Sequence, residues 1–249
     1  MLPSAAHTEE FTVRSYDLDW NRRLRLQTLC GYLEESAGLH ADVLGVGLER
    51  LMAEGRTWVL LRLRLRLVLP LDCGRRVRVK TWPVEREGLH FRRDFLLEDE
   101  SGRILVRAVS HWAVLGLASR RLEPVPEYIA VLKPENPPRA LEDGAIRIPA
   151  PSGATEGPSF PVRLSDIDLN RHVNNSRYLD FILEAADAFG RKTGLAGLDL
   201  IFRAEGLPGD VIGSRTAPGE DGRTLLHSLQ RLSDGRELVR ASSVWNSPQ

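Results

Sequence analysis

The chain has 249 residues, and its 34 Lys and Arg residues balance 34 Asp and Glu residues. This length suits two domains of ordinary size, and a net charge of zero provides no overall field that attracts a polyanion. The sequence contains no nucleic-acid-binding motif, Walker loop, G-x-G-x-x-G segment or zinc-ligand spacing. We therefore predict no nucleic-acid partner, no cofactor and no metal site.

The N-terminus and the cysteines predict the compartment. The first residues, MLPSAAHTEEF, have neither the basic segment nor the apolar run of a secretory signal. No apolar run approaches the roughly 20 residues that span a bilayer. The two cysteines, Cys30 and Cys73, lack metal-ligand or redox spacing, which favours a reducing environment. We therefore expect a cytoplasmic protein without membrane association.

The first half predicts one helix followed by strands. Apolar residues recur at steps of three and four from Leu26 to Leu44, which indicates a helix with one apolar face. In Trp58–Leu69 the run LRLRLRL alternates, with Leu61, Leu63, Leu65 and Leu67 on one face and Arg62, Arg64 and Arg66 on the other. The arginine row is either a solvated sheet face or a surface that attracts an acidic partner. Further strands are expected near Val77–Lys80, Leu89–Leu97 and Ile104–Leu115.

A proline-rich stretch then separates two predicted domains. Nine of the fifteen prolines lie between Pro124 and Pro161, which excludes a continuous helix or a central strand. We expect a first domain over residues 1–120, a linker over 121–157 with at most a short helix near Glu127–Leu132, and a second domain over 158–249.

The second half repeats the plan of the first. A helix is expected from about Asn175 to Arg191, with Asn174 or Asn175 as its N-cap. Its apolar face consists of Tyr178, Ile182, Ala185 and Phe189. Strands are expected at Leu198–Glu205, Asp210–Ala217, Thr224–Leu232 and Glu237–Trp245.

A short internal repeat supports a duplication. Residues 16–25 read YDLDWNRRLR and residues 165–174 read SDIDLNRHVN, so the pattern D-x-D-x-N-R occurs twice at a constant offset of 149 residues. The matched pairs are Asp17 with Asp166, Asp19 with Asp168, Asn21 with Asn170 and Arg22 with Arg171. Each copy precedes a predicted helix and a series of strands, which describes two α+β units with an antiparallel sheet around one helix.

The segment from Asp166 to Ala185, DIDLNRHVNNSRYLDFILEA, closely resembles the active-site segment D-x-N-x-H-V-N-N-x-x-Y of acyl-acyl-carrier-protein (acyl-ACP) thioesterases. The segments RTWVLLRLRLRL, VRVKTWP, HFRRDFLLED and SHWAVLGLASRRLEPVP are also similar to that family in kind and order. The resemblance covers roughly Phe11 to Trp245. It implies a tandem (double) hot-dog fold, with the acyl chain held chiefly by the first domain and hydrolysis in the second.

The resemblance also implies the catalytic residues. The Asp, Asn and His of the family motif fall on Asp168, Asn170 and His172. The family's catalytic acid lies on a later strand similar to LEYRREC, which here reads LDLIFRAEG and places Glu205 on the acid and Gly206 on the cysteine. The absence of that cysteine argues against a covalent thiol route and leaves Glu205 as the candidate base.

These residue types suit thioester hydrolysis. The N–H groups at a helix N-terminus polarise a carbonyl, and Asn170 and His172 add donors just before the helix. Glu205 is the expected general base for direct attack by water, and Asp168 orients Asn170 or His172. Asp168 and Asn170 also have a structural interpretation, because their counterparts Asp19 and Asn21 occur in the copy that has Arg23 in place of histidine. In the predicted strand, Glu205 points either into a groove or into solvent.

The expected function is hydrolysis of fatty acyl-ACP in fatty acid biosynthesis. The alternatives are an acyl-CoA thioesterase with the same site, a hot-dog dehydratase, which the H-V-N-N segment disfavours, and a non-catalytic acyl-binding protein. The two halves form within one chain the pseudo-dimer that single-domain relatives build from two chains, and pairing of two such chains as a homodimer is left open.

Overall fold

The computed structural model describes residues 6–71, 74–130, 137–142, 147–191 and 194–246. Contacts within the chain divide it into two compact units, Met1–Glu142 and Asp143–Gln249, called unit 1 and unit 2 below. Cys30 is buried and is a free thiol, whereas Cys73 lies outside the described residues.

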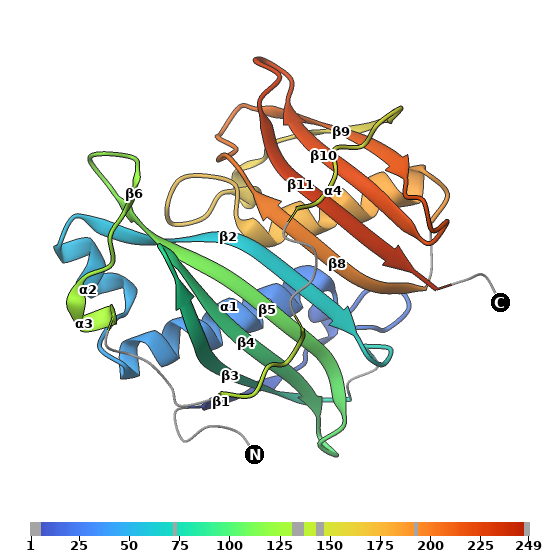
Figure 1. Cartoon of the computed structure of the whole chain (residues 1–249). Helices are drawn as coiled ribbons and strands as arrows, with labels where there is room; N and C mark the ends of the chain where they lie inside the picture. The colour runs from blue at the N-terminus through green and yellow to red at the C-terminus, as the bar shows by residue number, and fades with distance from the viewer. Residues whose placement is uncertain (1–5, 72–73, 131–136, 143–146, 192–193, 247–249) are drawn as a thin grey trace. The chain divides into compact units, whose positions relative to one another are not determined.

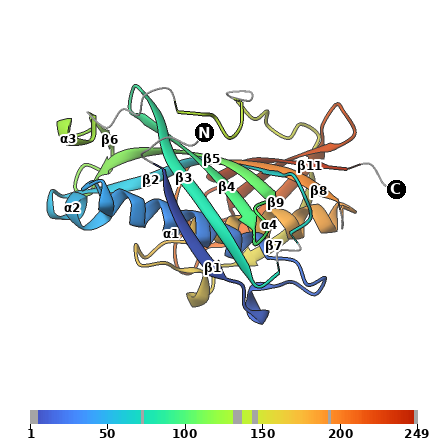
Figure 2. The ribbon, with the colours of Figure 1, turned by 90° about the horizontal axis from the view of Figure 1, so that it is seen from below.

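Unit 1 is an antiparallel sheet with one long helix against it (Figure 1). Its elements are, in chain order, β1 (His7–Thr12), η1 (Ser15–Asp17), α1 (Leu26–Val43), α2 (Leu48–Ala53), β2 (Arg56–Leu67), β3 (Arg76–Glu87), β4 (His90–Asp99), β5 (Ile104–Gly116), β6 (Leu122–Glu123) and α3 (Glu127–Ala130). The long strands follow the order β1-β3-β4-β5-β2, and β6 pairs with the end of β5. Figure 2 shows α1 as a second layer beside this sheet.

Unit 2 has the same topology (Figure 1). Its elements are β7 (Thr155–Pro161), η2 (Leu164–Asp166), α4 (Asn175–Ala188), β8 (Leu195–Phe202), β9 (Val211–Pro218), β10 (Thr224–Arg231) and β11 (Glu237–Trp245). Its strands follow the order β7-β9-β10-β11-β8, with β7 to β11 in the places of β1 to β5. The helix α4 contacts β7, β9 and β10. The tandem hot-dog fold predicted from the sequence is therefore confirmed.

The two long helices use the apolar faces expected from their sequences. In α1 the buried face includes Leu26, Leu29, Leu33 and Ala37, and in α4 it includes Tyr178, Ile182 and Ala185. Helix α4 ends at Ala188, three residues before the predicted end, because Gly190 adopts a positive φ of 94° that a regular helix excludes. Burial of these faces against the sheets provides most of the stabilisation of the two helices.

Two details of the predicted strands are wrong. Simple alternation placed Leu61 on the buried face of β2, but Leu60 is buried instead, with 3% of its surface exposed. A β-bulge between Leu60 and Arg62 inserts one residue and shifts the phase there. Strand β8 ends at Phe202 rather than at Glu205, so Glu205 lies in the loop that follows.

The end of unit 1 covers part of the arginine row on β2. The Arg64 guanidinium donates to the Glu142 carbonyl at 3.2 Å. Nearby, the buried Asp94 carboxylate accepts from the Ala140 N–H at 2.6 Å and pairs with Arg92 at 2.7 Å. Because chain segment 137–142 binds these groups, the row is not the fully solvated face that alternation alone suggests.

Candidate active site

A rigid double turn precedes α4. The Asp166 carboxylate accepts from the Arg163 N–H at 2.8 Å, and the Asp168 carboxylate accepts from the Asn170 N–H at 2.8 Å. Arg171 then adopts a left-handed conformation with φ of 66°, which short Asp- and Asn-rich turns tolerate. The Asp168 N–H donates to the His172 carbonyl at 3.0 Å and closes the turn. The turn thus fixes the backbone of His172.

Helix α4 begins immediately after this turn. The Asn174 side chain caps it by accepting from the Ser176 N–H at 2.8 Å, which confirms the predicted N-cap. The Asn175 N–H has no acceptor among the described residues. It therefore offers a backbone donor at the positive end of the helix, three positions after His172.

The equivalent turn of unit 1 has nearly the same hydrogen bonds. The Asp19 carboxylate accepts from the Asn21 N–H at 2.8 Å, and Arg22 has a φ of 62°. Asp19 additionally accepts from the Arg23 N–H at 2.9 Å. Because Asp19 stabilises a turn that has no histidine, Asp168 has the same structural function in unit 2.

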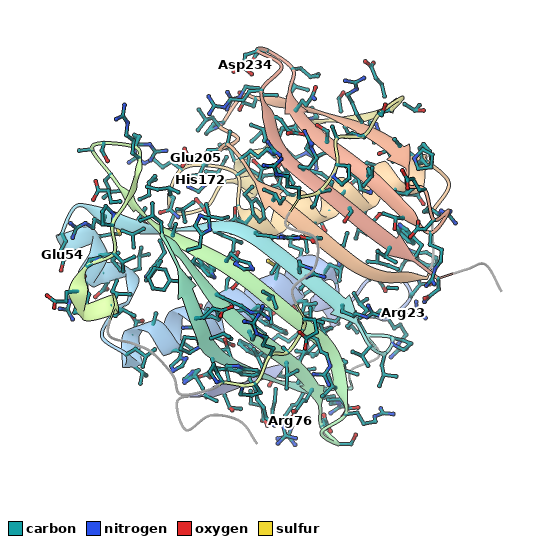
Figure 3. All side chains as sticks on the ribbon, viewed as in Figure 1. Arg23, Glu54, Arg76, His172, Glu205 and Asp234 are labelled. Carbon is teal, nitrogen blue, oxygen red and sulfur yellow. The ribbon has the colours of Figure 1, made fainter. Side chains whose placement is uncertain are left out.

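His172 lies between the carboxylates of Asp168 and Glu205. Figure 3 shows His172 beside Glu205. Its Nδ1 is 3.7 Å from Asp168 Oδ2, and its Nε2 is 3.8 Å from Glu205 Oε1. The three side chains are partly accessible, with 22% of His172, 18% of Asp168 and 38% of Glu205 exposed. Both distances exceed a direct hydrogen bond. A small rotation of the ring, or a water molecule bound to both partners, would connect the three groups.

Glu205 reaches His172 because its loop is joined to the double turn. The Val173 N–H donates to the Gly206 carbonyl at 2.8 Å. The Gly206 N–H donates to the Tyr178 hydroxyl on α4 at 3.0 Å. A Cβ on Gly206 would lie 2.7 Å from that hydroxyl and 2.9 Å from Val173 Cγ2, so this packing requires glycine.

Two residues that support the Glu205 loop were not predicted as part of the site. Burial raises the pKa of Tyr178 far above its ordinary value, so its hydroxyl stays protonated. The Arg231 guanidinium donates to the Glu205 carbonyl at 2.6 Å and pairs with Asp210 at 2.9 Å. The Y of N-N-x-x-Y could have indicated Tyr178, whereas no local pattern marks Arg231.

Asn170 differs from the other three predicted site residues. Its side chain is exposed and makes no hydrogen bond within the described part of the chain. The structure thus brings Asp168, His172 and Glu205 together and leaves the Asn170 amide at the surface of the turn.

Among its described residues, unit 1 has no counterpart of the histidine–glutamate pair. The Leu24 N–H donates to the Leu71 carbonyl at 3.1 Å, in the same place as the Val173–Gly206 bond of unit 2. The residue before Leu71 is Pro70, and the residue before Leu24 is Arg23. Arg23 and Pro70 therefore occupy the positions of His172 and Glu205.

Unit 1 contains an apolar pocket instead. Its enclosed volume is about 10 Å³, and its lining comes from α1, β2, β4 and β5. The lining residues are Cys30, Leu33, Glu34, Leu60, Leu63, Phe95, Ser110 and Trp112.

Within the described ranges, His, Cys, Asp and Glu side chains form no group of three or more that could hold a metal ion. In the same ranges, every helix is too short or too polar to cross a membrane.

Both halves of the chain match models of one protein family. Residues 4–132 match the acyl-ACP thioesterase N-terminal domain, and residues 151–247 match the C-terminal domain of the same family. The chain is 30% identical to palmitoyl-acyl carrier protein thioesterase of Arabidopsis thaliana, over 96% of this chain and 63% of that protein. It is 29% identical to the Cuphea hookeriana enzyme of the same name, over 95% of this chain and 61% of that protein. The chain thus spans about three-fifths of these relatives.

Two solved structures share the fold over nearly the whole chain. An acyl-ACP thioesterase from Bacteroides thetaiotaomicron superposes with a TM-score of 0.84 at 24% identity, covering 97% of this chain and 98% of that one. A 12:0-ACP thioesterase from Umbellularia californica gives a TM-score of 0.83 at 24% identity, with 99% of both chains covered. The models of one family match both halves of the chain, and the fold is shared with solved members of that family. This chain therefore belongs to the acyl-ACP thioesterase family.

Proposed function

We propose that this protein hydrolyses fatty acyl-ACP thioesters to free fatty acid and ACP by direct attack of water. The observation that carries the proposal is the position of His172 between Asp168 and Glu205, at the N-terminus of α4. Membership of the acyl-ACP thioesterase family supports ACP as the carrier. Residues 1–120 bind the acyl chain, residues 121–157 link the domains, and residues 158–249 perform the chemistry. The absence of redox or metal-ligand spacing between Cys30 and Cys73 suits the cytoplasm.

Each group of the site has one task in this reaction. Glu205 removes a proton from the attacking water, which forms the new C–O bond. The Asn175 N–H and the dipole of α4 stabilise the charge that develops on the carbonyl oxygen. When the C–S bond breaks, His172 passes the proton held by Glu205 to the departing thiolate. A thiolate is a good leaving group, so no covalent enzyme intermediate is needed.

Asp168 supports His172 rather than contacting the reacting atoms. Its Oδ1 is used in the turn, and its Oδ2 faces His172 Nδ1 at 3.7 Å. A proton on Nδ1 that points to Asp168 leaves Nε2 available toward Glu205. The exposed Asn170 amide adds a donor at the mouth of the site only if its rotamer changes when substrate binds. We therefore assign Asn170 a smaller contribution to kcat than His172 or Glu205.

The test is thiol release from acyl-ACP substrates of varied chain length, with acyl-CoA substrates in parallel. His172→Ala and Glu205→Gln are expected to lower kcat by about 10² to 10⁴ while the protein stays folded by circular dichroism. His90→Ala, which removes an exposed histidine from β4, serves as the control and should retain wild-type turnover. Near-wild-type activity of His172→Ala would show that the site is elsewhere. Tight acyl binding without cleavage would support the acyl-binding alternative.

A further inference from the structure

The double turn of unit 2 presents apolar side chains to solvent next to the site. Leu164 is 89% exposed and Leu169 is 99% exposed. Arg163 and Arg171 flank them, are exposed, and have no carboxylate partner among the described residues. We call these four residues the turn surface.

The turn surface is held in a fixed conformation. The carboxylates of Asp166 and Asp168 bind backbone N–H groups on either side of Leu164 and Leu169. Single exposed leucines are common on protein surfaces and need no explanation. Two nearly fully exposed leucines between two unpaired arginines, on a rigid turn, form a small apolar centre with a basic rim, which is typical of a docking surface.

The turn surface is also close to the reacting groups. Leu169 precedes His172 by three positions in the chain, so their Cα atoms lie within about 11 Å of each other. A partner that binds Leu169 therefore delivers any flexible arm it carries to His172. The unpaired arginines favour an acidic partner, because complementary charge raises the rate of association.

We propose that the turn surface docks the acidic carrier protein whose phosphopantetheine arm brings the acyl thioester to His172. This inference rests on the proposed function and adds the place of docking. Coenzyme A and pantetheine carry the same thioester without a protein surface, so their hydrolysis does not depend on Leu169. The alternative partner for the turn surface is a second copy of this chain.

Unit 1 provides matched controls. Trp20 and Arg22 occupy the positions equivalent to Leu169 and Arg171, and Trp20 is 86% exposed. Arg22 shares the positive φ of Arg171. Arg23 follows this turn in place of a histidine. Trp20→Asp and Arg22→Glu therefore make the same kinds of charge change as Leu169→Asp and Arg171→Glu, but at a turn without the catalytic pair.

The experiment compares kcat and KM for acyl-ACP and for acyl-pantetheine of the same chain length. Leu169→Asp and Arg171→Glu are expected to raise KM for acyl-ACP by about tenfold or more, with kcat and acyl-pantetheine hydrolysis unchanged. Arg171→Glu should also weaken the salt dependence of KM for acyl-ACP. Trp20→Asp and Arg22→Glu should behave as wild type.

Other outcomes overturn the proposal in distinguishable ways. If the wild type cleaves both substrates and the Leu169 and Arg171 variants keep their KM for acyl-ACP, the docking surface is wrong and the hydrolase remains. If Trp20→Asp and Arg22→Glu raise KM for acyl-ACP as much as the Leu169 and Arg171 variants do, the docking surface is also wrong. If Leu169→Asp splits a dimer in sedimentation, the surface binds a second copy. If the wild type cleaves neither thioester, the proposed function fails together with the docking site.

Discussion

The positions of His172 and Glu205 are fixed by different kinds of contact. The backbone of His172 is fixed by hydrogen bonds within ten residues of chain, from Arg163 to His172. Glu205 follows the end of β8 and is positioned by groups from other elements, namely Val173, Tyr178 and Arg231. The geometry of the proposed general base therefore depends on residues outside the His172–Glu205 pair.

Tyr178→Phe tests this dependence. The substitution removes the acceptor of the buried Gly206 N–H, and an unsatisfied buried donor costs about 1 to 3 kcal/mol. We expect the Glu205 loop to shift and kcat to fall by up to about 10²-fold, with little change in KM. Steady-state kinetics combined with thermal unfolding checks this. A large loss of stability with unchanged kcat would show that Tyr178 supports the fold and does not position Glu205.

A buried histidine outside the site makes stability depend on pH. His227 on β10 is completely buried, with its ring nitrogens 3.1 Å from Thr216 Oγ1 and 2.8 Å from Ser243 Oγ. Burial lowers its pKa from 6.5 to about 4, so between these values the unfolded chain binds more protons than the folded one. The free energy of unfolding therefore decreases as pH falls from 6.5 to 4, by about 3 kcal/mol for this residue.

His227→Gln should flatten that dependence, because glutamine keeps hydrogen-bonding groups and does not titrate. The measurement is urea unfolding of both proteins between pH 7 and pH 4. A second check is the ring resonance of His227 in the folded wild type, which should not shift above pH 5. Parallel stability curves, or a ring that titrates near pH 6.5, would contradict the prediction.

The sequence alone predicted the functions of some site residues and not of others. Asp168 and Asn174 act on N–H groups two residues away, so their turn and cap functions follow from residue type and spacing. Glu205 lies 33 residues after His172, and only the resemblance to a family suggested the pairing. Its proximity depends on the Val173–Gly206 hydrogen bond, which no local pattern encodes. Their catalytic functions stay predictions.

At the scale of elements, α1 and α4 begin at equivalent residues but are capped differently. Asn174 caps α4 with its side chain, whereas Arg25, at the equivalent position before α1, makes no side-chain cap bond. We expect Asn174→Ala to destabilise the protein by about 1 kcal/mol and Arg25→Ala to have a much smaller effect. Urea unfolding of the two variants makes the comparison. Equal losses would show that the Asn174 cap contributes nothing specific.

The helices were easier to predict than the strands. Periodicity and capping are local, so the first residue of both long helices agrees with the structure. The alternation of buried and exposed side chains along β2 shifts at Leu60 because of a bulge, and β8 ends at Phe202. Both features are set by hydrogen bonding to neighbouring strands, β5 and β11 respectively, which alternation along one strand does not contain.

At the scale of the whole molecule, one topology occurs twice and the two copies carry different groups. Strands β1 to β5 and β7 to β11 follow the same order, and the two turns share their aspartate and left-handed arginine. Unit 1 has Arg23 and Pro70 where unit 2 has His172 and Glu205, and it has an apolar pocket. A duplicated fold thus retains its turn for structural reasons and has the proposed reactive pair in one copy.

This division predicts one reactive site per chain. A non-hydrolysable acyl thioether on the carrier should bind with a stoichiometry of one per chain in calorimetry. Arg23→Ala and Pro70→Ala should keep turnover within about twofold of wild type, because they change surface residues away from the proposed chemistry. A stoichiometry of two, or a large loss of kcat in Arg23→Ala, would mean that the turn of unit 1 takes part in the reaction. The persistence of Asp19 in the first copy would then require a catalytic explanation in addition to its hydrogen bonds in the turn.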